Sequence, residues 1–233
     1  MFRLRAGDAT RQVVARSCLV LAPHPDDELF GAGGTIMAKL AAGTAVTVAI
    51  ATDGRASAHP AGLSEDDMAE LRCGEARRAA AVMGLRDADL RFLGFADGLL
   101  SASLPELRAA VVELIAEVSP EEILVVSALD PHPDHRSLNR AAVSASQGGP
   151  VVLEYPVWFW ARAPRLAAEV SSGSGIRDVL RVWWRLPVVR VRVGEWRDRK
   201  RAAFIAYATR AHLGSFFESS FLGRHEYFFP VGR

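Results

Sequence analysis

Short apolar runs alternate with longer stretches of helical spacing over the first two thirds of the chain. Runs rich in Val, Ile and Leu that end at Pro, Gly or a charged residue are typical of strands buried in a parallel sheet. The pattern predicts strands at 17–23, 46–51, 89–93, 123–127 and 151–155. The stretches between them predict helices, with Ser64 as one N-cap, at 29–42, 64–84, 104–118 and 135–147.

Strands that alternate with helices indicate βαβ units, so we expect an α/β fold with a Rossmann-like, doubly wound and mostly parallel sheet. A chain of this length is expected to form one domain over 1–233, with its core at 17–155. The remainder, 156–233, is less regular along the sequence. It predicts a strand at 188–193, a helix at 195–212 and an irregular closing segment, together forming a wall or lid over a substrate.

Composition excludes several classes of protein. Half of the 233 residues are hydrophobic and 24% are charged, which is ordinary for a globular domain. The net charge of +1 gives no sign of the basic surface that binds nucleic acid. Cys18 and Cys73 form no recognisable disulfide or metal pattern. The N-terminus lacks a signal-peptide core, and no stretch approaches the roughly 18 apolar residues that span a bilayer. We therefore expect a cytoplasmic protein; peripheral membrane contact and oligomeric state stay open.

Two polar clusters follow two of the predicted strands. Ala22-Pro-His-Pro-Asp-Asp-Glu28 comes after the strand at 17–23, and Asp130-Pro-His-Pro-Asp-His135 comes after the strand at 123–127. In a doubly wound sheet these strands are neighbours where strand order reverses, and ligands bind at the carboxyl ends of strands there. A single His-Pro-Asp is most often a turn, but two at the same edge of the sheet predict a functional site.

The residue types in these clusters suit a catalytic zinc ion. Zinc takes imidazole nitrogen and carboxylate oxygen, and a catalytic site keeps three protein ligands and one open position for water. His24, Asp27 and His135 would supply such a set, and the pKa of the bound water then falls toward ~7. Iron or cobalt suits the same donors, so the sequence does not fix the native metal.

The remaining acids and histidine of the clusters suggest the other catalytic roles. Asp26, next to Asp27, is free to act as general base on the attacking water. His132, as an imidazolium, would stabilise the oxyanion or protonate the leaving amine. Asp134 is placed to orient a histidine from behind the ligand set. For Glu28, a purely structural role is as plausible as a catalytic one.

The glycines at Gly31, Gly33 and Gly34 do not have the spacing of a dinucleotide-binding loop. They fall inside a predicted helix, and we expect them to allow close packing of that helix on a strand. A serine or cysteine hydrolase finds no support, because the sequence has no G-x-S-x-G elbow and no motif around Cys73.

At the two clusters the sequence resembles the PIG-L/LmbE-like deacetylase family, whose hallmarks are Ala/Pro-His-Pro-Asp-Asp-Glu and a later His-Pro-Asp-His. The resemblance covers 17–155 well and 195–229 loosely. Secondary similarities are Asp53-Gly54, Arg72-x-x-Glu75, Asp97-Gly98 and the late helix from Lys200 to Tyr207. One departure is Thr209-Arg210, where many members have Ser-Gln, so a family role for that Gln is in doubt here.

The resemblance implies a divalent metal, usually zinc, at His24, Asp27 and His135. It implies hydrolysis of an N-acetyl group from N-acetylglucosamine in a glycoconjugate, glycolipid, thiol cofactor precursor or antibiotic intermediate. The acceptor sugar and the pathway are not determined by the sequence.

The same resemblance also assigns roles to single residues. It maps the general base to Asp26, the histidine that aids the oxyanion to His132 and the supporting acid to Asp134. It maps a substrate-contacting arginine to Arg72, although a structural salt bridge between Arg72 and Glu75 is nearly as strong an alternative.

Tryptophans and arginines concentrate at 156–190. Aromatic faces stack on sugar rings and Arg binds phosphate or carboxylate, so this segment would recognise a sugar with an acidic or lipid group. A buried aromatic core, a dimer contact and a membrane interface are the alternatives.

Two rival functions stay open beside N-deacetylation. One is amidase action on a larger N-acyl or thiol-conjugate substrate, and the other is a non-catalytic module that binds a sugar or nucleotide. Asp26 and His132 argue against the binding module, because binding alone requires neither.

Overall fold

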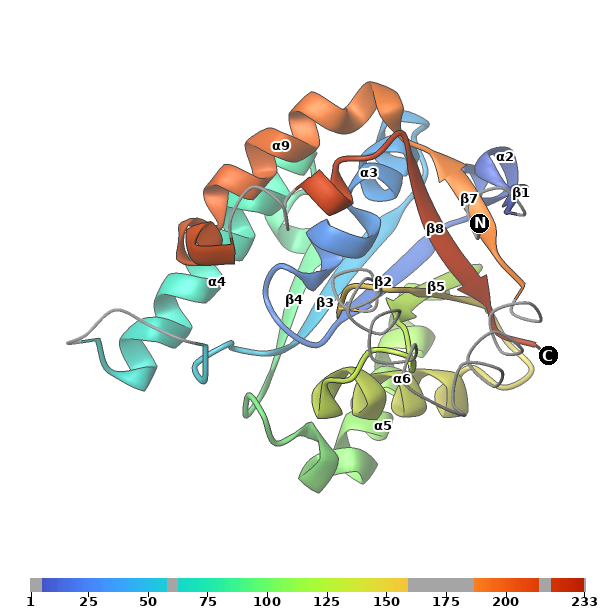
Figure 1. Cartoon of the computed structure of the whole chain (residues 1–233). Coiled ribbons are helices and arrows are strands. Elements are labelled where there is room, and N and C mark those ends of the chain that lie inside the picture. Colours follow the sequence, from blue (N-terminus) through green and yellow to red (C-terminus); the bar gives the residue numbers. More distant parts are fainter. Residues whose placement is uncertain (1–5, 58–62, 159–186, 214–218, 233) are drawn as a thin grey trace, which may run out of the picture.

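The computed structural model describes residues 6–57, 63–158, 187–213 and 219–232 (Figure 1). Five parallel strands form most of one eight-stranded sheet with the order β1-β7-β8-β6-β5-β2-β3-β4. Their bounds are β2 (Cys18–Ala22), β3 (Val46–Thr52), β4 (Leu90–Phe95), β5 (Glu122–Val126) and β6 (Val151–Tyr155). β2 pairs with both β3 and β5, so strand order reverses at β2 as the sequence predicted.

Helices cover both faces of this sheet, which confirms the predicted fold class. In Figure 1, α3 (Asp27–Ala41), α4 (Glu65–Met83) and α9 (Arg197–Ala206) lie on one side, and α5 (Leu104–Val118) and α6 (Pro133–Ala145) lie on the other. The predicted N-cap of α4 is confirmed, because the Ser64 hydroxyl accepts from the Asp67 N–H and the Asp67 carboxylate accepts from the Ser64 N–H. Short helices in the first half of the chain are α2 (Thr10–Ala15), η1 (Asp87–Asp89) and η2 (Leu100–Ser103).

The C-terminal part is more regular than the sequence predicted. The closing segment, expected to be irregular, contains β8 (His225–Pro230), which lies antiparallel between β6 and β7 (Val189–Arg192). β8 escapes pattern reading because Glu226, a polar residue, is one of its buried positions. A further two-residue strand, β1 (Gly7–Asp8), pairs in parallel with β7 at the sheet edge.

The helix predicted at 195–212 is wrong in its continuity. The segment is divided into η3 (Gly194–Trp196), α9 and η4 (Ala208–Leu213), with a break at Tyr207. Tyr207 leaves helical geometry at φ −90° and ψ 62°, and its hydroxyl donates to Glu28 Oε1 at 2.5 Å. A tertiary hydrogen bond therefore accompanies the break, and local propensity gave no sign of it.

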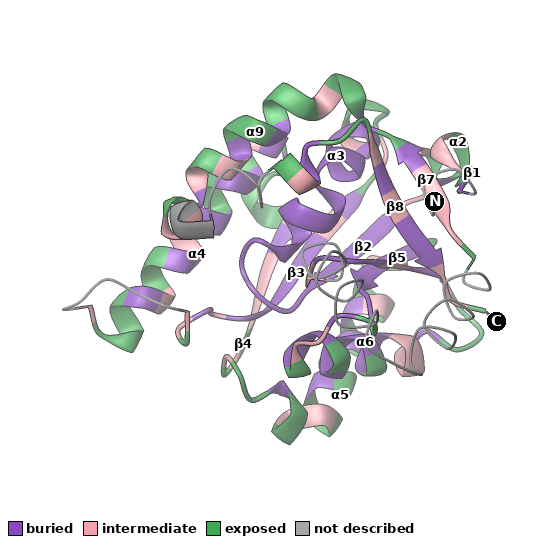
Figure 2. Ribbon diagram, in the orientation of Figure 1, coloured by how far each residue is buried: buried purple, intermediate pink, exposed green. Residues whose placement is uncertain are grey.

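The core is centred on β2 and β5, in which every residue is buried (Figure 2). A Cβ at Gly31 would overlap the ring of Tyr155 on β6, and a Cβ at Gly34 would lie 2.7 Å from the Val193 Cβ. This confirms the prediction that the glycines of α3 allow close packing. This close packing fixes the position of the N-terminus of α3, where the first polar cluster lies.

Candidate functional site

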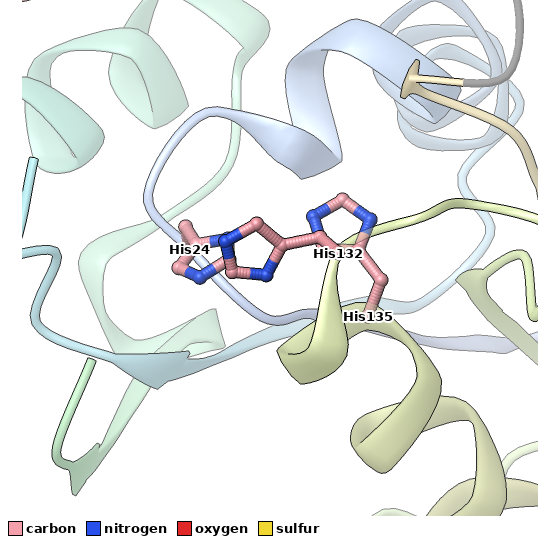
Figure 3. Close-up of side chains that lie close together, drawn as sticks. All are labelled: His24, His132 and His135. Atoms are coloured by element: carbon pink, nitrogen blue, oxygen red, sulfur yellow. The ribbon is translucent and has the colours of Figure 1, made fainter. Parts of the chain in front are cut away.

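The two polar clusters meet at the carboxyl ends of β2 and β5. His24 lies in the loop between β2 and α3, while His132 caps α6 and His135 lies in its first turn. Figure 3 shows the three imidazole rings gathered together, and their ring nitrogens lie within 4.8 Å of one another. His24 and His135 are buried, whereas His132 is half-buried.

The three predicted metal ligands are brought together. Asp27 Oδ2 lies 3.1 Å from His24 Nδ1 and 3.3 Å from His135 Nε2. Ligands of a tetrahedral zinc ion with bonds of about 2.0–2.2 Å are themselves roughly 3.3 Å apart. His135 Nε2 is also a buried nitrogen for which no hydrogen bond is formed among the described residues. The donor set therefore fits a divalent metal ion.

Carboxylates hold the outer nitrogens of both candidate histidine ligands. His24 Nε2 lies 3.2 Å from Asp134 Oδ2 and 3.2 Å from Asp97 Oδ1, and His135 Nδ1 lies 2.9 Å from Asp130 Oδ2. Such partners fix the tautomer and orientation of a ligating imidazole. Asp134 lies where the sequence predicted it, behind a histidine.

Asp97 and Asp130 were not predicted as site residues. Each had a sequence signal: Asp130 opens the second cluster, and Asp97 stands in the Asp-Gly pair after the third predicted strand. The structure also groups His24, Asp97 and Asp134, whose candidate ligand atoms lie within 4.8 Å of one another. The Asp134 carboxylate is fixed in turn by the Gly98 N–H at 2.7 Å and the Leu100 N–H at 3.2 Å.

The excess of carboxylates shifts the pKa values of the two histidines. Burial lowers the pKa of His24, but hydrogen bonds to Asp134, Asp27 and Asp97 outweigh it and raise the pKa well above 6.5. Burial also lowers the pKa of His135. The charge of Asp27 and the hydrogen bond to Asp130 outweigh burial and raise this pKa to about 9. The site thus attracts positive charge, which protons or a divalent cation can supply.

His132 differs from the other two histidines. Burial, followed by the charges of His24 and His135, lowers the pKa of His132, which favours neutral imidazole over the imidazolium expected from the sequence. Its Nδ1 accepts from the Asp134 N–H at 3.3 Å as the N-cap of α6. Because Nδ1 is the acceptor, the proton of the neutral ring is on Nε2.

Asp26 has a backbone conformation that is unusual for a residue with a Cβ, with φ at 119°. Its N–H donates to Glu28 Oε2 at 3.0 Å, and the other Glu28 oxygen accepts from the Tyr207 hydroxyl. Glu28 is buried and burial raises its pKa to about 7. Of the two roles considered for Glu28, the contacts support the structural one, because it fixes the Asp26 backbone.

Two guanidinium groups contact one oxygen of Asp26. Arg72 Nη2 lies 2.7 Å from Asp26 Oδ2, and Arg210 of η4 contacts the same oxygen through Nε. Arg72 also pairs with Glu75 at 3.0 Å, which confirms the salt bridge that the sequence offered as the alternative. The Arg72 side chain is fully buried, so the structure gives it no surface for a substrate, and direct substrate contact stays only a prediction.

Two predictions concern features other than this site: the Trp- and Arg-rich segment and the absence of a membrane-spanning stretch. Most of the Trp- and Arg-rich segment at 156–190 falls on 159–186, outside the described residues. In the part of the chain that the structure describes, no helix has the length and apolarity needed to cross a membrane.

One curated sequence relative of this chain is named as a probable deacetylase. A probable N-acetyl-alpha-D-glucosaminyl L-malate deacetylase 2 from Bacillus cereus is 36% identical over 135 residues, covering 56% of this chain and 60% of the relative. The chain therefore matches about three fifths of that relative's length.

Solved structures share the fold at lower identity. N,N'-diacetylchitobiose deacetylase from Pyrococcus horikoshii superimposes with a TM-score of 0.69 at 18% identity, covering 96% of this chain and 90% of that one. GalB, the 4-carboxy-2-hydroxymuconate hydratase from Pseudomonas putida KT2440, also gives 0.69 at 18% identity, covering 94% and 97%. Because a hydratase shares this fold, the fold alone does not select the reaction.

The family comparison covers both polar clusters. The PIG-L family model, described as GlcNAc-PI de-N-acetylase, matches residues 19–146, which is more than half of the chain. This range includes the His-Pro-Asp-Asp-Glu segment, the His-Pro-Asp-His segment and the sheet edge that joins them. The chain therefore belongs to the PIG-L family.

Proposed function

We propose that this protein is a metal-dependent hydrolase that removes the N-acetyl group from an N-acetylglucosamine-type sugar in a glycoconjugate or small-molecule intermediate. The observation that carries the proposal is the convergence of His24 Nδ1, Asp27 Oδ2 and His135 Nε2, with Asp26 next to Asp27 in the sequence as the N-cap of α3. The family and the deacetylase relative support the reaction class.

His24, Asp27 and His135 are the residues that would hold the metal, and zinc is the ion we propose, with iron or cobalt as alternatives. A bound zinc ion supplies Lewis-acid chemistry, because it polarises a carbonyl oxygen and makes water more acidic. Asp130 and Asp134 keep the two imidazoles in the tautomers that direct Nδ1 of His24 and Nε2 of His135 toward Asp27.

Asp26 is the proposed general base. It takes a proton from the attacking water as the new C–O bond forms, and it returns that proton to the amine nitrogen as the C–N bond breaks. The products are acetic acid and the free amino sugar, with no net change in protons on the enzyme. The acid then ionises to acetate, and its proton passes to the amine or to solvent. Arg72 and Glu28 hold the Asp26 side chain and backbone in place for both transfers.

His132 is the proposed oxyanion donor. A neutral ring with its proton on Nε2 can donate a hydrogen bond to the acyl oxygen as negative charge develops there. Its position one turn before His135 on α6 places it at the same edge of the sheet. Asp134 supports this arrangement by fixing His24 and by donating its N–H to His132 Nδ1.

The test combines metal content with acetate release from a panel of N-acetylglucosamine conjugates. Wild type should bind metal and release acetate. Asp26→Ala should keep the metal and lose roughly 10²–10⁴-fold in rate, whereas His135→Ala should lose the metal. Arg197→Gln, which changes an exposed charge on α9, is the matched control and should behave as wild type.

Each alternative has its own outcome in this test. Retention of the metal by His135→Ala would refute the site assignment. A metal-loaded wild type that releases longer acids but no acetate would identify an amidase, and one that turns over no amide would refute the proposed hydrolase. Failure of wild type to bind metal would favour the non-catalytic binding module.

A further inference from the structure

Arg210 contacts Asp26 in a way that leaves most of its guanidinium group unused. Its Nε contacts Asp26 Oδ2, and its side chain is 19% exposed. Among the described residues, no hydrogen bond or ion pair involves Arg210 Nη1 or Nη2. Within the described residues, the two Nη atoms, which can bind an oxyanion with two parallel hydrogen bonds, therefore make no polar contact with the protein.

Arg72 differs from Arg210 because both of its Nη atoms contact other groups of the protein. Its side chain is fully buried, and its Nη atoms contact Asp26, Glu75, Thr209 and the Pro25 carbonyl. Asp26 thus has an ion-pair partner without Arg210, and its backbone is held separately by Glu28. Internal contacts therefore engage both Nη atoms of Arg72, whereas within the described part of the chain they engage neither Nη atom of Arg210.

Carboxylates surround the two buried histidines of the site. Asp97 and Asp134 both lie within 3.2 Å of His24, and Asp130 lies behind His135. The metal ion proposed for this cluster would offset part of its negative charge. The partly exposed guanidinium group of Arg210 would attract a negatively charged substrate group.

Building on the proposed function, we infer that Arg210 is a specificity-determining residue that binds a carboxylate group of the substrate through its Nη atoms. The preferred substrate is then an N-acetylated amino sugar with a carboxylate on its aglycone. A planar guanidinium group matches a carboxylate with two parallel hydrogen bonds, which a lysine or an amide cannot reproduce.

The test uses one substrate pair that differs only in charge: N-acetylglucosaminyl L-malate and its dimethyl ester. The full-length, zinc-loaded wild type should prefer the acid by at least about tenfold in kcat/KM, with the difference mainly in KM. Arg210→Gln should reduce the acid-to-ester ratio to near one, and Arg210→Lys should give an intermediate ratio. Arg197→Gln removes an exposed charge from α9 and should keep the wild-type ratio.

The ratio isolates recognition from catalysis. Because Arg210 also contacts Asp26, Arg210→Gln is expected to slow both substrates, and this common loss cancels in the acid-to-ester ratio. A wild-type ratio near one, or a wild-type preference that survives in Arg210→Gln, would overturn the inference.

Failure of the proposed function would look different. If wild type releases no acetate from either compound, the hydrolase proposal fails, and calorimetric binding of the same pair decides the role of Arg210. Tighter binding of the acid that Arg210→Gln abolishes would support the inference, and equal binding of acid and ester would overturn it.

Discussion

Two of the buried clusters of charged residues on α3 differ in how their charges balance. In the middle of α3, Glu226 of β8 accepts from the Gly34 N–H, the Thr35 N–H and the Thr35 hydroxyl at 2.7–2.8 Å. Lys200 of α9 lies 2.7 Å from Glu226 and also donates to the Phe30 carbonyl. This cluster has one acid and one base, both with protein partners.

The cluster at the N-terminus of α3 is not balanced in this way. Four carboxylates surround His24 and His135, and His135 Nε2 has no hydrogen bond among the described residues. The balanced pair joins α9 and β8 to α3, whereas the four carboxylates of the second cluster outnumber its two histidines. The comparison teaches that burial of charge alone does not mark a functional site, because a buried acid and base with protein partners can serve packing alone.

The largest expected effect tests the balanced cluster. Lys200→Met leaves the Glu226 carboxylate buried and unpaired, so we expect a loss of about 3–5 kcal/mol in the free energy of unfolding, measured in urea. Adding Glu226→Gln removes the unpaired charge and should recover much of that loss. Metal bound per folded molecule should not change. A loss below about 1 kcal/mol would contradict the structural role.

Metal addition tests the unbalanced cluster. Zinc at 100 times its Kd should stabilise the metal-free protein by about 2.7 kcal/mol, because it binds only the folded state at this site. His135→Ala should lose this increment in thermal unfolding, whereas Lys200→Met should keep it. An equal increment in all three proteins would show that zinc binds elsewhere.

The carboxylate behind His135 should affect metal affinity, which is measured per folded molecule because Asp130 is buried and also accepts from the Val157 N–H. Asp130→Ala removes the partner of His135 Nδ1, and we expect a 10–100-fold weaker metal affinity in competition with a chelator. Asp198→Ala, at an exposed acid on α9, is the control. If both variants keep wild-type affinity, Asp130 does not orient a metal ligand.

The smallest expected effect concerns the N-cap of α4, where Ser64 pairs with Asp67 outside both clusters. Ser64→Ala removes the N-cap of α4 and should cost about 1 kcal/mol in unfolding, with metal content and activity unchanged. The Ser64 bonds hold the pKa of Asp67 below 3.8, so this stabilisation is complete above pH 3.8 and declines as the pH falls below it. The difference between variant and wild type should therefore narrow in acid. A difference that stays constant with pH would exclude the Asp67 contribution.

Much of the fold and the candidate site could be predicted from local pattern. The continuous apolar run at Cys18–Ala22 predicts a strand buried on both faces, and all five of its residues are buried. The two His-Pro-Asp segments follow neighbouring strands, so the reversal of strand order was sufficient to bring His24, Asp27 and His135 together. Their role as metal ligands stays a prediction.

Contacts between distant segments were decided only by the tertiary structure. Arg210 meets Asp26, and Glu226 meets Thr35, across more than 180 residues of sequence. No periodicity or spacing records such pairs, because helical and strand patterns report only which face of an element is buried. A buried Glu in β8 therefore reads as a surface residue until Lys200 and the N–H groups of α3 are placed around it. The sequence determined which elements form over 17–155 and what chemistry follows β2 and β5. The packing of α9, η4 and β8 decided which charges those residues face.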